Sequence, residues 1–327
     1  MSALAAVKKG IEKLIDRYGR DIYYLRMSLT ERCNLKCIYC RSESEYCKAK
    51  TELTADQYST ILNGLVSLGI RKVRVTGGEP LVRKDLERII SDIASHEEIR
   101  EICMTTNGIG LSERLPELKQ AGLQRLNISM DTLDPDLYRK MTRGGDLAAV
   151  LKGIEMAQSL EMPVKINAVV VRGKNDQEAE RLISLAKESA IDIRFIELMP
   201  MGVLGEDKNA RVRNEEILRR HPELRPLPPA YPSQPSMDYT ADGFKGKVGF
   251  ISPVSHKFCN VCNRVRLTSD GKLRMCLANN YETDLMPHLQ SGEELLQVMQ
   301  AAMFNKPECH TFEEAFHTSR TMNQIGG

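Results

Sequence analysis

Between residues 23 and 199 the sequence alternates six times between a short strand-forming run and, in most intervals, an amphipathic helical pattern. The predicted strands span residues 23–29, 71–76, 101–106, 124–130, 163–171 and 192–198. The predicted helices span residues 54–69, 85–94, 112–121, 147–160 and 176–189, the first opening with a capping box formed by Thr54 and Gln57. Such a series predicts parallel strands with right-handed crossovers. An incomplete barrel and a doubly wound sheet both satisfy it, and both collect functional residues at the carboxyl ends of the strands.

The pattern changes after Pro200. A helix is expected over residues 213–221, followed by a proline-rich connector over 225–236 without regular structure. Strands are expected over 246–250 and 264–275, the latter folded at the Asp270-Gly271 turn, and a helix over 293–304. We therefore divide the chain into an N-terminal helical segment (1–20), an α/β unit (21–200) and a smaller C-terminal α+β domain (201–327).

Composition excludes some classes of function. The net charge is only +2, which does not favour a nucleic-acid scaffold or a membrane-surface binder. No stretch approaches the roughly 20 apolar residues that a membrane-spanning helix needs. The N-terminal residues mix Lys, Glu and Asp with apolar side chains and lack a secretory signal. We expect a cytoplasmic protein without nucleic-acid or membrane partners.

The first cysteine group directly follows the first predicted strand. Cys33, Cys37 and Cys40 form a CX3CX2C run. Three thiolates on one loop can bind three irons of a [4Fe–4S] cluster and leave the fourth iron open to a small molecule. A zinc site would lack its fourth ligand here, because no histidine lies nearby. The cluster is the favoured interpretation.

A second cysteine group lies near the C-terminus. Cys259, Cys262 and Cys276 form a CX2CX13C set, and the predicted hairpin returns Cys276 toward the other two. A zinc knuckle completed by His256 is the rival interpretation, but this histidine precedes the pair in an awkward register. A second cluster with an open iron is favoured. Cys47, Cys103 and Cys309 match neither group and are interpreted as ordinary thiols.

Two motifs resemble those of radical S-adenosylmethionine (SAM) enzymes. The cysteine run has Tyr39 before its last Cys, and Thr76-Gly77-Gly78-Glu79-Pro80 follows the second predicted strand, as the GGEP motif of this family does. The resemblance implies an incomplete (β/α)6 radical SAM barrel. It also implies that Glu79 accepts a hydrogen bond from the SAM ammonium group. The positions that match SAM contacts of the family are Tyr39, Gly78, Glu79, Ser129 and Met199.

The resemblance narrows to the family of GTP 3′,8-cyclases from residue 21 onward. It is carried by residues 249–255, the second cysteine set, Arg264-Val265-Arg266 and the terminal Gly326-Gly327. A triphosphate requires several cations, and basic residues recur on the predicted strands. The positions that match GTP contacts are Arg26, Lys72, Arg74, Thr105, Lys165, Arg194, Arg264 and Arg266. By the same resemblance, Arg264, Arg266, Gly326 and Gly327 serve catalysis, and the glycine tail closes the site.

This family implies a reaction and a set of partners. Two [4Fe–4S] clusters and SAM would cyclise GTP to 3′,8-cyclo-7,8-dihydroguanosine triphosphate, the first step of molybdenum cofactor biosynthesis. The resemblance implies a low-potential electron donor and cyclic pyranopterin monophosphate synthase as the next enzyme, and it allows a homodimer. The alternatives are a radical SAM enzyme that modifies a peptide, with an auxiliary cluster, and a zinc-stabilised binding module without enzymatic activity.

Overall fold

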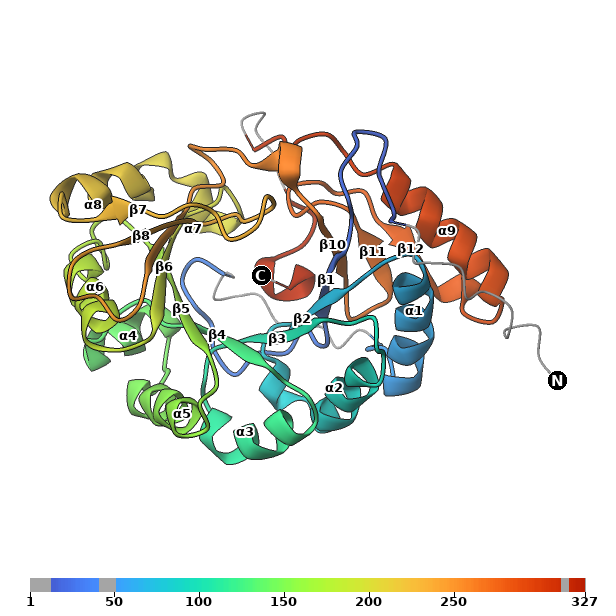
Figure 1. Ribbon diagram of the computed structural model, residues 1–327, viewed down its shortest axis with the longest axis horizontal. Coiled ribbons are helices and arrows are strands. Elements are labelled where there is room, and N and C mark those ends of the chain that lie inside the picture. The colour runs from blue at the N-terminus through green and yellow to red at the C-terminus, as the bar shows by residue number, and fades with distance from the viewer. Residues whose placement is uncertain (1–12, 41–50, 313–317, 327) are drawn as a thin grey trace.

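The computed structural model describes residues 13–40, 51–312 and 318–326, which form one curved sheet with helices outside it (Figure 1). The strands are β1 (Tyr24–Ser28), β2 (Lys72–Thr76), β3 (Glu101–Thr106), β4 (Arg125–Ser129), β5 (Val164–Val170), β6 (Asp192–Glu197), β7 (Arg225–Pro226), β8 (Met237–Thr240), β9 (Val248–Ile251), β10 (Arg264–Leu267), β11 (Lys272–Arg274) and β12 (Thr283–Asp284).

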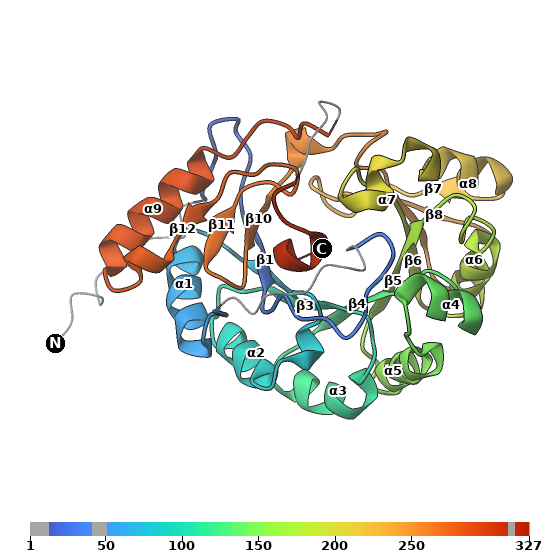
Figure 2. The ribbon, with the colours of Figure 1, turned by 180° about the vertical axis from the view of Figure 1, so that it is seen from behind.

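Most of the helices pack on the outside of this sheet, and a short C-terminal helix lies inside its curve (Figures 1 and 2). The α-helices are α1 (Ala55–Ser67), α2 (Leu86–Ala94), α3 (Leu111–Gln120), α4 (Pro135–Thr142), α5 (Leu147–Ser159), α6 (Ala179–Glu188), α7 (Gly202–Glu206), α8 (Asn214–Arg220), α9 (Gly292–Phe304) and α10 (Met322–Ile325). The 3₁₀ helices are η1 (Pro80–Val82), η2 (Lys208–Ala210), η3 (Cys259–Val261) and η4 (Met286–His288).

The sheet runs in the order β12-β11-β10-β1-β2-β3-β4-β5-β6-β9-β8-β7. The central strands, from β10 to β9, are parallel, and the outer strands on each side pair antiparallel. Among the described residues the two end strands do not pair with each other, so the barrel is incomplete. Residues after 200 supply the outer strands on both sides, so the predicted C-terminal domain shares its sheet with the barrel.

Alternation along the strands separates an apolar outer face from a polar interior. On β2, Val73 and Val75 are fully buried against the helical layer, whereas Arg74 and Thr76 face the other way. The apolar core therefore lies between the sheet and its helices. The interior of the barrel is left for polar chemistry.

The six predicted strands of the barrel are confirmed, each to within one residue at either end. The capping box at Thr54 and Gln57 is also confirmed, and α1 ends just before Gly69. Helix α4 was not predicted, although Asp134 caps it and Pro135 occupies its first turn, which is a recognisable start signal.

Two local predictions were wrong. Residues 13–20, expected to be helical, form a turn because Asp16 accepts hydrogen bonds from the amides of Tyr18 and Arg20 and Gly19 adopts φ +80°. The remainder of that predicted segment lies outside the described residues. The connector over 225–236 contains β7, which pairs with β8. Pro226 is tolerated there because β7 is the last strand of the sheet.

Candidate active site

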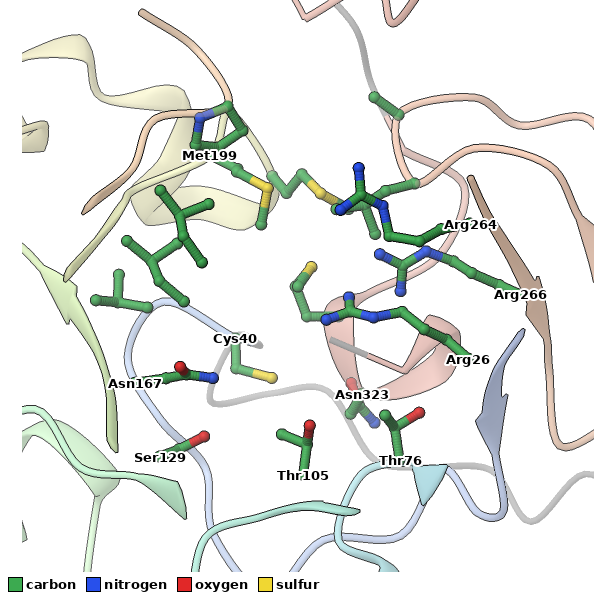
Figure 3. Close-up of a pocket in the computed structure, with 18 of the residues that line it drawn as sticks. Arg26, Cys40, Thr76, Thr105, Ser129, Asn167, Met199, Arg264, Arg266 and Asn323 are labelled. Carbon is green, nitrogen blue, oxygen red and sulfur yellow. The ribbon is translucent and has the colours of Figure 1, made fainter. Parts of the chain in front are cut away.

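A cavity of about 340 Å³ lies at the carboxyl ends of the strands, inside the curve of the sheet. All six cysteines of the two groups line it, although more than 200 residues separate the groups in the sequence. Figure 3 shows Arg26, Arg264 and Arg266 on one side of this space, with Ser129, Asn167 and Met199 across from them. The fold thus joins two sets of thiols and a row of cations in one enclosure.

The first cysteine loop leaves the end of β1 and is anchored to neighbouring elements. The amides of Lys36 and Ile38 donate to the carbonyls of Thr142 and Met141 at the end of α4, at 3.1 and 2.9 Å. The hydroxyl of Tyr39 donates to Asp131 Oδ2 at 2.7 Å. Burial raises the pKa of the Cys37 thiol, and the neighbouring Cys40 adds to the effect. A cationic partner would favour ionisation of this thiol, and a metal cluster supplies one.

The turn after β2 packs closely against the chain that leads to this loop. The Gly78 amide donates to the Thr30 carbonyl at 2.6 Å, and the Glu79 amide donates to the Arg32 carbonyl at 2.8 Å. A Cβ on Gly78 would lie 2.3 Å from the Arg32 carbonyl oxygen. The glycine is therefore required for backbone packing, whatever ligand the cavity holds.

Glu79 lines the cavity but is only 1% exposed. Its carboxylate accepts hydrogen bonds from the amides of Leu81 and Asn107, at 3.0 and 2.6 Å, and from Thr106 Oγ1 at 2.7 Å. Burial nevertheless raises the pKa of Glu79 to about 7, because these hydrogen bonds compensate only part of the lost hydration. A cationic group in the cavity would favour the ionised carboxylate.

The second cysteine group is formed by η3 and by the residue two positions beyond β11. Lys306, 2% exposed, reaches this corner, and its Nζ donates to the carbonyls of Arg264, at 2.8 Å, and Met275. Burial, which by itself would raise the pKa of Cys262, is outweighed by Arg264 and Lys306, which lower it to about 6. Arg264 and Lys306 therefore stabilise the thiolate of Cys262, the form that binds iron, whereas burial raises the pKa of Cys259.

Each group offers three thiols, the donor set of a cubane cluster with one open iron. Among the described residues, no three Cys, His, Asp or Glu side chains converge on a point that could hold a single metal ion. A cubane cluster does not require such convergence, because each thiolate binds a different iron at a separate corner. Both groups fit clusters.

Of the predicted GTP contacts, Arg26, Thr105, Arg264 and Arg266 line the cavity. The other four do not line it: Lys72, Arg74, Lys165 and Arg194. Lys72 pairs with Glu101 at 2.5 Å, and Lys165 pairs with Asp192 at 2.5 Å. Burial first, and then Arg74, lower the pKa of Arg26 to about 10.

Several buried polar atoms that border the cavity have no hydrogen-bond partner among the described residues: Arg26 Nε, Thr76 Oγ1, Thr105 Oγ1, Asn167 Oδ1 and Arg264 Nη2. A buried polar group without a partner costs about 1–3 kcal/mol. Donors and acceptors occur together in this set, so the cavity is suited to a polar ligand with both kinds of group.

All predicted SAM contacts line the cavity: Tyr39, Gly78, Glu79, Ser129 and Met199. Near the chain end, residues 322–325 form α10, and Met322 and Asn323 also line the cavity. Gly326 follows at φ +68°, where a Cβ would lie 2.2 Å from Thr76 Oγ1. Gly327 lies outside the described residues.

Sequence reasoning missed other residues that line the cavity, including Asn107, Asn167, Lys306 and His310. Asn107 directly follows β3, so the rule that placed Ser129 would have found it. Asn167 lies inside β5, where its position depends on the register that pairs it with Ser129. Lys306 and His310 follow α9 and have no comparable signal. Cys103 is buried on β3, and Cys309 is exposed. Cys47 is not among the described residues.

Two family models match the chain. The Radical SAM superfamily model covers residues 27–186, and the Molybdenum Cofactor Synthesis C model covers residues 191–312. No helix in the described part of the chain combines the length and apolar character needed to cross a bilayer.

Among solved structures, that of Streptococcus suis SuiB bound to S-adenosylmethionine resembles this chain with a TM-score of 0.57 and 17% identity, over 85% of this chain and 65% of SuiB. The structure of SuiB bound to its precursor peptide SuiA gives a TM-score of 0.59 at 16% identity, covering 88% of this chain and 65% of SuiB. The chain thus spans just under two thirds of SuiB, and the likeness shows a common fold.

Similarity to curated proteins extends over nearly the whole chain. The chain is 46% identical over 319 residues to GTP 3′,8-cyclase of Alkaliphilus oremlandii, covering 95% of this chain and 99% of the relative. It is 43% identical over 319 residues to GTP 3′,8-cyclase of Peptoclostridium acidaminophilum, covering 96% and 98%. With both family models matching in order along the sequence, the chain belongs to the GTP 3′,8-cyclase family of the radical SAM superfamily.

Proposed function

We propose that the chain cyclises GTP to 3′,8-cyclo-7,8-dihydroguanosine triphosphate, the first step of molybdenum cofactor biosynthesis. As a radical SAM protein it uses SAM and an iron–sulfur cluster; we propose two [4Fe–4S] clusters, one for each cysteine group. The observation that carries the proposal is that both groups line the same cavity, with Arg26, Arg264 and Arg266 beside them.

Cys33, Cys37 and Cys40 would hold the cluster that binds SAM. Glu79, Ser129, Tyr39 and Met199 line the cavity, and we propose that they contact SAM, with Glu79 accepting a hydrogen bond from its ammonium group. When bound, this cluster and SAM would supply the one-electron chemistry that removes the hydrogen atom at C3′ of the ribose. C3′ would then bond to C8 of guanine, and one electron from the donor together with a proton would complete the 7,8-dihydro ring. The role of the protein is to position the two molecules and to exclude water.

Cys259, Cys262 and Cys276 would hold the second cluster, whose open iron would bind the guanine. Arg26, Arg264 and Arg266 would contact the nucleotide from the adjoining strands. Two further cations that do not line the cavity, Lys72 and Arg74, lie on the strand next to that of Arg26 and over the ring of Tyr24. A triphosphate requires such a concentration of charge, because its desolvation is compensated only by several paired cations.

Two measurements test this proposal. Anaerobically reconstituted protein should contain about eight irons per chain, as expected for two cubane clusters. Incubation with GTP, SAM and a strong reductant should give the cyclised nucleotide, identified by mass spectrometry and NMR. Zinc at either cysteine group, or intact GTP after SAM has been consumed, would contradict the proposal.

The partners follow from the same reaction. A low-potential electron donor must reduce the clusters, and cyclic pyranopterin monophosphate synthase would take up the product. A homodimer is the assembly that we propose to look for, by sedimentation. Modification of a peptide remains the alternative reaction, but no feature of the cavity favours it. The zinc-stabilised binding module is set aside, because the chain belongs to an enzyme family.

A further inference from the structure

One buried arginine anchors the C-terminal segment that enters the cavity. Arg320, which precedes α10, is only 7% exposed. Its guanidinium binds both carboxylate oxygens of Asp270, at 3.1 and 2.9 Å, and both oxygens of Glu282, at 2.8 and 2.6 Å. A third carboxylate, Glu31, lies 3.6 Å away. We call Arg320 and these three carboxylates the tail latch.

Arg320 is the cation that joins the three carboxylates of the tail latch. A second buried guanidinium, that of Arg274, pairs with Glu282. Without Arg320 the three carboxylates would lose the cation that they share, and their mutual repulsion and poor hydration would strongly disfavour the closed arrangement.

The carboxylates of the latch come from the two regions that carry the cysteines. Glu31 lies two residues before Cys33, and Asp270 lies in the turn between β10 and β11, whose second strand leads to Cys276. Beyond Arg320, Asn323 Nδ2 donates to the Glu31 carbonyl at 2.9 Å, and Arg266 donates to the carbonyls of Ile325, at 3.2 Å, and Gly326. The latch therefore fixes the segment relative to both cysteine groups at once.

We propose that Arg320 is a positioning residue that sets how far the C-terminal segment enters the cavity. Arg320 does not line the cavity, whereas Met322 and Asn323 do, so it acts through them. The inference builds on the proposed function and on the expectation, from the family resemblance, that the glycine tail closes the site. Lysine cannot replace it fully, because an ammonium group cannot bind two carboxylates in the bidentate manner of a guanidinium.

Hydrogen–deuterium exchange of the reconstituted protein without GTP tests the latch directly. In Arg320→Gln, the amides of residues 322–326 should exchange faster, on the order of 100-fold, as expected when one partner of a buried ion-pair network is lost. Arg320→Lys should show a smaller increase. The matched control is Arg172→Gln, which removes a more exposed pair with Glu216 at 2.9 Å and should leave the exchange of these amides unchanged.

The amount of SAM consumed per cyclised GTP distinguishes a positioning role of Arg320 from a general loss of structure. If the latch positions the segment, Arg320→Gln should consume more SAM per cyclised GTP while both clusters remain at full iron content. If Arg320→Gln does not fold, the exchange of residues 322–326 and the ratio of SAM to product are measured on Arg320→Lys and Asp270→Asn instead. Unchanged exchange of residues 322–326, or an unchanged ratio of SAM to product, would overturn the proposal. Failure of wild-type protein to cyclise GTP would instead overturn the proposed function and leave the exchange result standing.

Discussion

The buried carboxylate of Glu79 affects both the stability of the fold and the binding of ligands. Its three hydrogen bonds hold the side chain in one orientation, and burial still raises its pKa to about 7. The folded chain therefore binds a proton at Glu79 more tightly than the unfolded chain, whose glutamates have pKa values near 4.5. Stability attributable to this group is highest at acidic pH and falls as the pH rises through about 7.

At the residue scale we predict that Glu79→Gln removes this pH dependence. Between pH 5 and 8 the wild-type free energy of unfolding should fall by about 2–3 kcal/mol relative to the variant, because each unit of pKa shift corresponds to about 1.4 kcal/mol. Urea denaturation of both reconstituted proteins across this range measures the difference. Glu155→Gln, at an exposed position, should follow wild type. Parallel curves for wild type and Glu79→Gln would contradict the prediction.

At the scale of elements, the turn after β2 fixes the position of the chain before Cys33. Gly78 allows the two backbones to approach, and the pairing places the loop of the first cysteine group beside Glu79. The motif was recognised from the sequence as a ligand site. Its packing role could not be predicted, because the partner backbone lies more than 40 residues earlier.

We predict that Gly78→Ala disrupts this contact. The new Cβ would meet the Arg32 carbonyl oxygen at 2.3 Å, so backbone must move, at a cost of about 1–3 kcal/mol. Urea denaturation should show this loss, and iron bound at the first cysteine group should decrease. Gly292→Ala is the control, because a Cβ there meets no atom within 4 Å and the residue begins α9. Equal stability of the two variants would show that the backbone accommodates the methyl group.

The strands of the barrel and the six cysteines could be predicted from sequence, because periodicity and spacing are local signals. Which of the predicted cations line the cavity could not be predicted. Arg74 lies at the same level of the sheet as Arg26 and Arg266, yet only the latter two line the cavity, so strand position alone does not decide it. The tail latch could not be predicted from the sequence either, because Arg320 contacts carboxylates that lie 38 to 289 positions earlier, at Glu282 and Glu31.

At the scale of the whole molecule, two cysteine groups on one sheet would hold separate clusters. We predict that replacing Cys259, Cys262 and Cys276 with Ser leaves about four irons per chain, and that replacing Cys33, Cys37 and Cys40 does the same. Iron analysis of the anaerobically purified variants, with electron paramagnetic resonance of the reduced samples, measures this. Loss of all iron from either variant would show that one cluster cannot assemble without the other.

The position of β1 has a consequence for synthesis on the ribosome. Tyr24 pairs with Lys72 on one side and with Arg264 on the other, 240 residues later in the chain. One flank of β1 therefore stays without its native partner until β10 has emerged. An unpaired strand of this kind invites association with other nascent chains. Cellular chaperones that shield this flank should raise the yield of intact protein more than amino acid substitutions in the later strands would.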